Sequence, residues 1–274
     1  SVGKSSVCGL IGSSIKCWGK GSYGRLGNGS TSDNATPVTV SGISNADSVA
    51  NGHRHACAVL DNSSVMCWGQ GSSGQLGNES TSDRSTPVSV IGISTATQVA
   101  VGSSHSCAVL SNGTVKCWGS GTLGDGSTTS IDIPVSVSGV STATQVAVGT
   151  YHSCVLLNNG TVKCWGLNNY GQLGDSSSNT SSLTPVLVSG ISNATQVSLG
   201  WFHSCALLID DTVKCWGNGI QGQLGNGQWE SQTSPVTVTG ITNVSKISTL
   251  AFHTCALLND QTGKCWGMGS IGRL

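Results

Sequence analysis

The chain carries little charge. Lys, Arg, Asp and Glu make up 9% of its 274 residues, against about 25% in an average soluble domain. Twelve basic and twelve acidic residues give a formal net charge of zero, so we expect no nucleic-acid partner and no anionic membrane surface as a target. No apolar run approaches the ~20 residues of a membrane span, and we expect no membrane insertion by this chain.

Glycine and neutral polar residues take the place of the missing charge. The chain contains 39 glycines, and serine and threonine recur throughout it. Threonine favours strands and serine favours turns, whereas glycine at this level argues against long helices. The composition therefore predicts an all-β protein with almost no helix.

The cysteines reveal a repeat. They form six pairs: Cys8 and Cys17, Cys57 and Cys67, Cys107 and Cys117, Cys154 and Cys164, Cys205 and Cys215, Cys255 and Cys265. The first members of successive pairs lie 49, 50, 47, 51 and 50 residues apart. A nearly constant period of this size indicates a repeat architecture.

Each repeat contains four short runs that read as strands. In one repeat these are Pro87–Val90, Thr97–Gly102, His105–Leu110 and Thr114–Gly119, separated by Gly, Ser, Asn and Pro. Each run is too short for a helix and lacks a 3.6-residue period. Four strands in about 50 residues is the content of one β-propeller blade.

The repeat units also predict how much of a propeller the chain contains. The P-V-x-V run occurs at Pro37, Pro87, Pro134, Pro185 and Pro235, and the C-W-G motif occurs six times. We therefore expect one propeller domain over residues 1–274, with five full blades and one hairpin. Because Val2-Gly3 matches Val101-Gly102, and Gly272–Leu274 matches Gly24–Leu26, we also expect the sequence to be cut within the motif at both ends.

The repeat motifs resemble those of the regulator of chromosome condensation repeat family. The resemblance rests on G-x-x-H-S-C-A at Gly102–Ala108, on V-K-C-W-G at Val115–Gly119 and on G-Q-L-G at Gly74–Gly77 and Gly171–Gly174. It covers the whole chain and implies a β-propeller, usually of seven blades. The chain resembles the secreted, cysteine-bearing branch more than the nuclear exchange factor. The third repeat departs from the pattern, with Gly121–Gly124 in place of the longer loop.

The spacing of each cysteine pair predicts a disulfide across a hairpin. If Ser111–Gly113 is a three-residue loop, then Cys107 faces Cys117, and Gly113 occupies the position that favours a left-handed conformation. The first pair is one residue closer, and a two-residue loop at Gly12-Ser13 again places its cysteines opposite each other. Zinc sites usually use C-x-x-C knuckles, which are absent, and reduced core cysteines are the other alternative. Six disulfides indicate an oxidising compartment, extracellular or at the cell surface.

Two recurring motifs resemble chemical sites. The pattern G-x-G-x-x-G at Gly69, Gly71 and Gly74 follows a strand, but no helix pattern follows it to bind a phosphate. Five histidines precede a cysteine by two residues: His55, His105, His152, His203 and His253. A ring of imidazoles could bind a metal, but no carboxylate recurs beside them, and we interpret them as hydrogen bonds between blades. We expect no metal, cofactor or catalytic site, because the adjacent serines point to the opposite face of the strand.

Aromatic residues divide into a recurring set and a variable set. The recurring tryptophans of C-W-G are interpreted as packing between blades: Trp18, Trp68, Trp118, Trp165, Trp216 and Trp266. The variable residues break the repeat and are candidates for a binding surface: Tyr151, Trp201, Phe202, Trp229 and Phe252. Variation within a repeat is where function is expected, although local packing is the alternative interpretation.

Nine N-x-[ST] sequons occur. Pro37 argues against the one at Asn34, and eight are candidate N-glycosylation sites: Asn28, Asn62, Asn78, Asn112, Asn159, Asn179, Asn193 and Asn243. Glycans would help a surface with so little charge to remain soluble.

Four functions compete. The first is a secreted, non-enzymatic propeller that binds a protein partner or glycans, or that assembles with itself as a structural element of a surface or a filament. The second is a secreted inhibitor or receptor-like binder, suggested by resemblance to propellers of smaller repeat that inhibit a secreted β-lactamase. Guanine-nucleotide exchange, the namesake activity, requires a cytosolic or nuclear setting that the cysteines oppose. No residue set supports the fourth, a secreted hydrolase.

Overall fold

A computed structural model describes residues 1–269; residues 270–274, including the expected motif Gly272–Leu274, lie outside the described residues. The chain divides into two compact units, Ser1–Ser141 and Thr142–Leu274, which we call the N-terminal and C-terminal units. The described residues form antiparallel sheets, one 3₁₀ turn η1 (Ser22–Gly24) and no α-helix. In this part of the chain, no helix is long and apolar enough to cross a membrane.

The N-terminal unit contains three sheets. The first has three strands: β1 (Ser6–Ile11), β2 (Ser14–Gly19) and β3 (Asn34–Thr39). The second has four: β4 (Ala46–Asn51), β5 (His55–Leu60), β6 (Val65–Gly69) and β7 (Arg84–Ser89). The third has four: β8 (Ala96–Val101), β9 (His105–Leu110), β10 (Val115–Gly119) and β11 (Ile131–Ser136).

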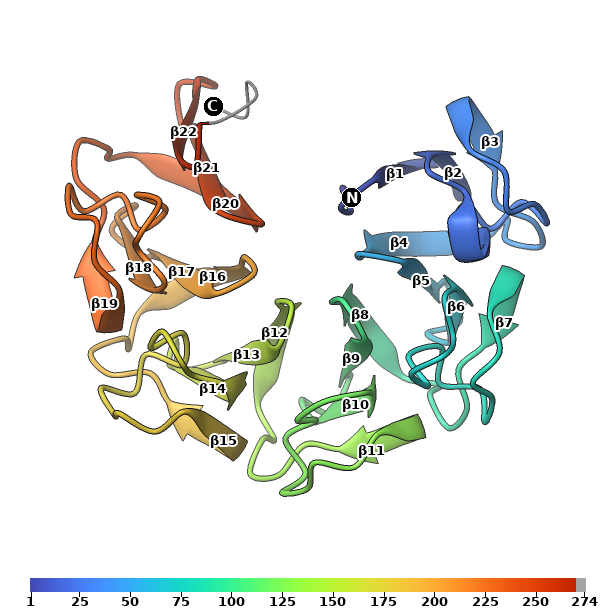
Figure 1. The fold of residues 1–274 in the computed structure, drawn as a ribbon, viewed down its shortest axis with the longest axis horizontal. Helices are drawn as coiled ribbons and strands as arrows, with labels where there is room; N and C mark the ends of the chain where they lie inside the picture. Colours follow the sequence, from blue (N-terminus) through green and yellow to red (C-terminus); the bar gives the residue numbers. More distant parts are fainter. Residues whose placement is uncertain (270–274) are drawn as a thin grey trace. The chain divides into compact units, whose positions relative to one another are not determined.

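The C-terminal unit repeats this arrangement (Figure 1). Its first sheet has β12 (Ala143–Val148), β13 (His152–Leu157), β14 (Val162–Leu167) and β15 (Ser181–Leu187). Its second has β16 (Ala194–Leu199), β17 (His203–Leu208), β18 (Val213–Gly217) and β19 (Gln232–Thr237). Its third has β20 (Val244–Leu250), β21 (His253–Leu258) and β22 (Gly263–Gly267).

Each sheet is an antiparallel meander in chain order, the content of a propeller blade. The strand that completes each blade differs from our expectation. The P-V-x-V strand β7 pairs with the preceding C-W-G strand β6, with Val88 opposite Cys67, so it closes a blade instead of opening the next. The described residues therefore form four sheets of four strands and two of three, and the expected count of five full blades and one hairpin is wrong.

The six predicted disulfides are present, each across its own hairpin. The ladder places Cys107 opposite Cys117, with Cα atoms 4.1 Å apart. Leu110 N donates to Thr114 O at 2.9 Å, and Gly113 has φ 76°, as the three-residue loop requires. In the shorter first hairpin, Ile11 lies opposite Ser14, and Cys8 opposite Cys17. The described residues contain no free cysteine.

The hydrophobic core lies between neighbouring sheets and repeats with them. In the N-terminal unit, the Cys57–Cys67 pair, Leu76 and Trp118 belong to one buried cluster. In the C-terminal unit, the cluster around Cys154 and Cys164 includes Trp216 of the next blade. Each described cluster thus joins the disulfide of one blade to side chains of the blade that follows it.

Candidate functional site

Three of the five recurring histidines, His55, His152 and His203, take part in hydrogen-bonded chains that link one blade to the next. Within the N-terminal unit, His55 Nε2 lies 2.8 Å from Ser106 Oγ, and that hydroxyl donates to Gln75 O at 2.9 Å. The indole Nε1 of Trp118 donates to the same carbonyl at 2.9 Å. Because the hydroxyl donates to the carbonyl, it accepts from the imidazole, so the ring carries its proton on Nε2.

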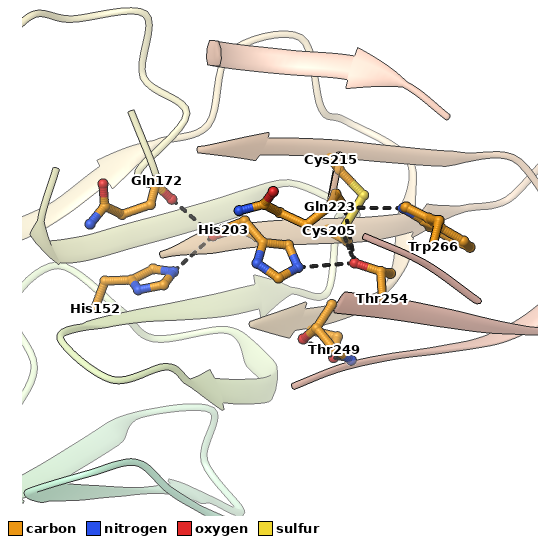
Figure 2. The surroundings of a disulfide bond; sticks show 11 residues. His152, Gln172, His203, Cys205, Cys215, Gln223, Thr249, Thr254 and Trp266 are labelled. Atoms are coloured by element: carbon orange, nitrogen blue, oxygen red, sulfur yellow. Dashed lines mark hydrogen bonds between the residues drawn. A yellow bond between two sulfur atoms is a disulfide. The ribbon is translucent and has the colours of Figure 1, made fainter. Parts of the chain in front are cut away.

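The C-terminal unit contains two copies of this chain (Figure 2). His152 Nε2 lies 2.9 Å from Ser204 Oγ, which donates to Gln172 O. His203 Nε2 lies 2.9 Å from Thr254 Oγ1, which donates to Gln223 O at 3.1 Å. Figure 2 shows that Trp266 reaches the same Gln223 carbonyl, from a distance of 3.0 Å.

A histidine beside a serine hydroxyl has the partners of a catalytic dyad, but this environment cannot support nucleophilic catalysis. His55, Ser106, His203 and Thr254 are fully buried, so no substrate can reach the hydroxyl. Desolvation lowers the pKa of both His55 and His203 to about 3, with a smaller contribution from neighbouring histidines. The rings are therefore neutral near pH 7 and act as structural hydrogen-bond donors.

The interface between the first two blades lacks both the histidine and the hydroxyl of this hydrogen-bonded chain. The residue equivalent to the histidine is Ser6 in the first blade, and the residue equivalent to the hydroxyl is Ala56 in the second. Asn51 links the two blades instead, because its Nδ2 donates to Ser6 O at 2.7 Å. The joint loss of donor and acceptor leaves no unpaired polar group at this interface, as expected if the two residues act as a pair.

Four of the recurring tryptophans pack against the G-x-L-G loop of the preceding blade: Trp68, Trp118, Trp216 and Trp266. Trp68 Nε1 donates to Arg25 O at 3.1 Å, and a Cβ atom added to Gly27 would lie 2.8 Å from that nitrogen. Trp118 has the same relationship to Gly77. Glycine in these loops thus leaves room for the indole. The G-x-G-x-x-G pattern at Gly69, Gly71 and Gly74 runs from the end of β6 into the loop that leads to β7 of the same blade.

The structure brings four of the five variable aromatic residues together and adds Tyr170. The rings form a continuous series: Tyr151 to Phe202 at 5.9 Å, Tyr170 to Phe202 at 5.4 Å, Phe202 to Phe252 at 6.2 Å and Trp201 to Phe252 at 4.9 Å between centroids. We call these five residues the aromatic cluster. They come from loops of three successive blades of the C-terminal unit.

The aromatic cluster lies at the surface. Tyr151 is 56% exposed and Tyr170 is 38% exposed, while the other three rings are partly buried. Sequence reasoning missed Tyr170, although it breaks the repeat before Gly171, where Ser73 and Gln221 precede the equivalent glycines. Trp229 lies apart from these ring contacts, in the loop between β18 and β19, next to Gly222 and 69% exposed.

The N-terminal unit has a hollow of about 370 Å³ lined by hydroxyl groups and one carboxylate, including those of Ser73, Thr81, Ser120 and Asp132. Among residues 1–269, no group of three or more His, Cys, Asp or Glu side chains could hold a metal ion.

The candidate glycosylation sites lie on strand connections and at blade edges. Asn62, Asn112, Asn159, Asn179 and Asn243 are exposed, and Asn28, Asn78 and Asn193 are partly buried. In the hairpin of Asn112, its Oδ1 accepts from Thr114 N at 3.0 Å and from Thr114 Oγ1 at 2.7 Å. The sequon is thus also the turn that closes the hairpin, and its glycosylation stays a prediction.

Comparison with known proteins defines the class. The family model of the RCC1-like domain matches residues 3–274, and the chain belongs to this family of β-propellers. The search of curated proteins found no match.

Solved structures share the fold at low sequence identity. Human WBSCR16 is 24% identical with a TM-score of 0.85, over 94% of this chain and 70% of its own. Yeast RCC1 (Prp20), solved bound to Kap60, is 20% identical with a TM-score of 0.85, over 98% of this chain and 69% of its own. The ectodomain of the Physcomitrella patens receptor kinase CR4 is 23% identical with a TM-score of 0.62, over 97% of this chain and 60% of its own.

Proposed function

We propose that this chain is an extracellular, non-enzymatic binding module that contacts a protein partner through the aromatic cluster of its C-terminal unit. The observation that carries the proposal is the series of five touching rings on loops of three blades. Exposed aromatic residues are enriched in protein interfaces, where they supply large contact areas at low entropic cost.

The extracellular setting is supported by the disulfides and by one structural neighbour. Six disulfides join the hairpins of this chain, and such bonds persist in oxidising compartments. One structure of the same fold is the ectodomain of a receptor kinase. Both observations favour secretion or display at a cell surface.

The non-enzymatic character is supported by the use of the reactive side chains. The fully buried hydroxyl of Ser106 hydrogen-bonds to His55 and to the Gln75 carbonyl. That carbonyl also accepts from the indole of Trp118, which lies in the same blade as Ser106. A nucleophile needs access to its substrate, and this hydroxyl has none.

The geometry of the rings favours a protein over a sugar. The Tyr170–Phe202 and Trp201–Phe252 pairs meet at 62° and 70°, edge against face, and the other two pairs are inclined by 31° and 29°. The five rings therefore do not share one plane and form a ridged surface instead of a flat shelf on which a sugar ring could stack. Trp201, Phe202 and Phe252 lack a hydroxyl group that could orient a sugar. A ridged apolar surface suits side chains of an extended or looped polypeptide.

Selection from a displayed peptide library tests the proposal. We expect peptides with apolar anchors to be enriched on the oxidised chain and to lose at least tenfold in affinity for Phe202→Ser. Serine is already present at the equivalent position, Ser104, so the variant should fold. The matched control is Ile209→Ser, which removes an exposed apolar side chain (74% exposed) from the hairpin between β17 and β18 of the same blade.

The outcomes separate the partner classes. Peptides that bind Phe202→Ser as well as the parent chain would show that the cluster is not the contact surface. Binding on a glycan array that depends on Phe202 would replace the protein partner by a carbohydrate. Concentration-dependent association in analytical ultracentrifugation, abolished by Phe202→Ser, would identify the protein partner as a second copy of this chain.

A further inference from the structure

The loops of the first two blades carry positive charge where the C-terminal unit carries aromatic rings. Arg54 precedes His55 as Phe202 precedes His203, and Tyr23 precedes its loop glycine as Tyr170 does. The Tyr170 ring contacts Phe202, whereas the centroid of the Tyr23 ring lies 5.3 Å from the guanidinium carbon of Arg54. The same pair of loop positions thus holds a cation in the N-terminal unit.

A second guanidinium group approaches the same ring. The Cζ atom of Arg25 lies 5.5 Å from the Tyr23 centroid. Arg25 is buried, and its nitrogens donate to Ser22 O at 3.0 Å, to Ser22 Oγ at 2.8 Å and to His53 O at 3.1 Å. These three acceptors are neutral, so they fix the position of the guanidinium without neutralising its charge.

The local charge is unbalanced. Lys20 pairs with Asp33 at 3.0 Å, and Asp33 also accepts from Gly21 N. That pair is neutral as a whole, so the guanidinium groups of Arg25 and Arg54 add two positive charges beside it, in a chain whose formal charge is zero.

The pKa of His53 is lowered by burial and by the positive charges around it. Burial is the largest cause that lowers its pKa to about 4, and the charges of Lys4, Arg54 and Arg25 lower it further. Burial, and after it the charge of Arg54, lower the pKa of Arg25. Cations held this close repel each other, and an anion between them would relieve the repulsion.

We propose that Arg25 and Arg54, whose guanidinium groups both lie close to the Tyr23 ring, bind a multiply charged oxyanion of the sulfate or phosphate class. Arg54 lies over the Tyr23 ring and keeps its in-plane N–H donors for a ligand, and their fork matches the oxygens of these anions. Arg25, whose nitrogens already donate to Ser22 and His53, contributes mainly its fixed positive charge. The same chemistry recognises a free inorganic ion or a sulfate ester on a polysaccharide. This site is separate from the aromatic cluster.

Titration calorimetry on the oxidised chain tests the site, with sodium sulfate, sodium phosphate and a heparin tetrasaccharide as ligands at an ionic strength fixed with sodium chloride. We expect saturable binding that falls about tenfold or more in Arg54→Gln and recovers in part in Arg54→Lys, because a charge-assisted hydrogen bond is lost and then partly replaced. Arg25→Gln should behave similarly, and it introduces the residue found at Gln75 and Gln172. The control, Lys116→Gln, removes one positive charge beside Gly92 O and should bind normally.

The results distinguish a specific oxyanion site from general electrostatic attraction of anions to the protein. Tighter binding of the tetrasaccharide, with the same dependence on Arg54, supports the site and identifies a sulfate ester as the source. Binding of the inorganic ions alone also supports the site and identifies a free anion. Heat no greater than that of chloride, or an equal loss in Lys116→Gln, would overturn the proposal.

Discussion

His55 Nε2 lies 2.8 Å from Ser106 Oγ, a residue 51 positions further along the chain in the next blade. We expect Ser106→Ala to lower the free energy of unfolding by about 1–3 kcal/mol, because it leaves the buried imidazole N–H without an acceptor. Urea unfolding monitored by tryptophan fluorescence measures this change. Ser106→Thr is the control, since Thr254 fills the equivalent position, and it should cost much less.

A double variant tests whether the two residues act as a pair. His55→Ser combined with Ser106→Ala reproduces the combination that the first interface carries in Ser6 and Ala56. We expect the double variant to cost less than the sum of the two single variants, because neither partner then remains unpaired. Strict additivity in the mutant cycle would contradict this interpretation.

Buried neutral histidines predict a loss of stability in mild acid. The pKa is lowered to about 3 for His55 and His203 and to about 4 for His105, with burial as the first cause. Between these values and the unfolded pKa near 6.5, the unfolded chain binds more protons than the folded chain. Stability is therefore complete above pH 6.5 and falls as the pH drops towards 4, by up to about 1.4 kcal/mol per pH unit for each histidine.

Urea titrations between pH 4.5 and 8 measure this dependence. The exposed carboxylates whose pKa is lowered by local hydrogen bonds, Asp210 and Asp260, lose their contribution only below this range. We expect His203→Gln to reduce the proton uptake on unfolding by about one. A stability that stays flat from pH 7 to pH 5 would show that the histidines are not buried in neutral form.

The disulfides should differ in how fast they are reduced. Cys265 is exposed and Cys255 is partly buried, whereas Cys205 and Cys215 are fully buried. A thiol reductant should therefore open Cys255–Cys265 first in the native chain, and mass spectrometry after alkylation would show the order. Replacing the Cys205–Cys215 pair by alanines should cost about 2–3 kcal/mol or more, because a short loop is released and buried atoms are lost. Simultaneous reduction of all six bonds would indicate global unfolding instead.

Two glycines with the same backbone conformation allow the cost of backbone strain to be measured apart from the cost of a steric clash with a tryptophan. Gly77 has φ 67° and faces Trp118, whereas Gly92 has φ 68° with nothing within 4 Å of an added Cβ. Gly92→Ala should cost about 1–2 kcal/mol from the left-handed backbone alone. Gly77→Ala should cost about 1–3 kcal/mol more, because the indole must move. Equal costs in chemical denaturation would mean that the indole shifts freely.

The features that could be predicted from the sequence depend on contacts between neighbours in the chain. The pairing of Cys107 with Cys117 follows from a loop length and from one glycine in it, and both lie within a single hairpin. The same local argument identified the all-β fold, since the strand runs and the turns between them repeat six times. The grouping of strands was mistaken because residues 90–95 form a shorter link than residues 70–83, yet the longer link is the one inside the blade.

The partners of the side chains that meet between blades were decided only by the tertiary structure. The adjacent His105 and Ser106 point to opposite faces, as alternation in a strand requires, and so Ser106 pairs with the histidine of the preceding blade. Tyr170 meets Phe202 across 32 residues, and Tyr23 meets Arg54 across 31. Sequence spacing fixes neither pair, because both depend on the height and rotation at which one twisted sheet packs against the next. The sequence alone thus determined the hairpins and their disulfides, and packing between blades determined which side chains meet at the surface.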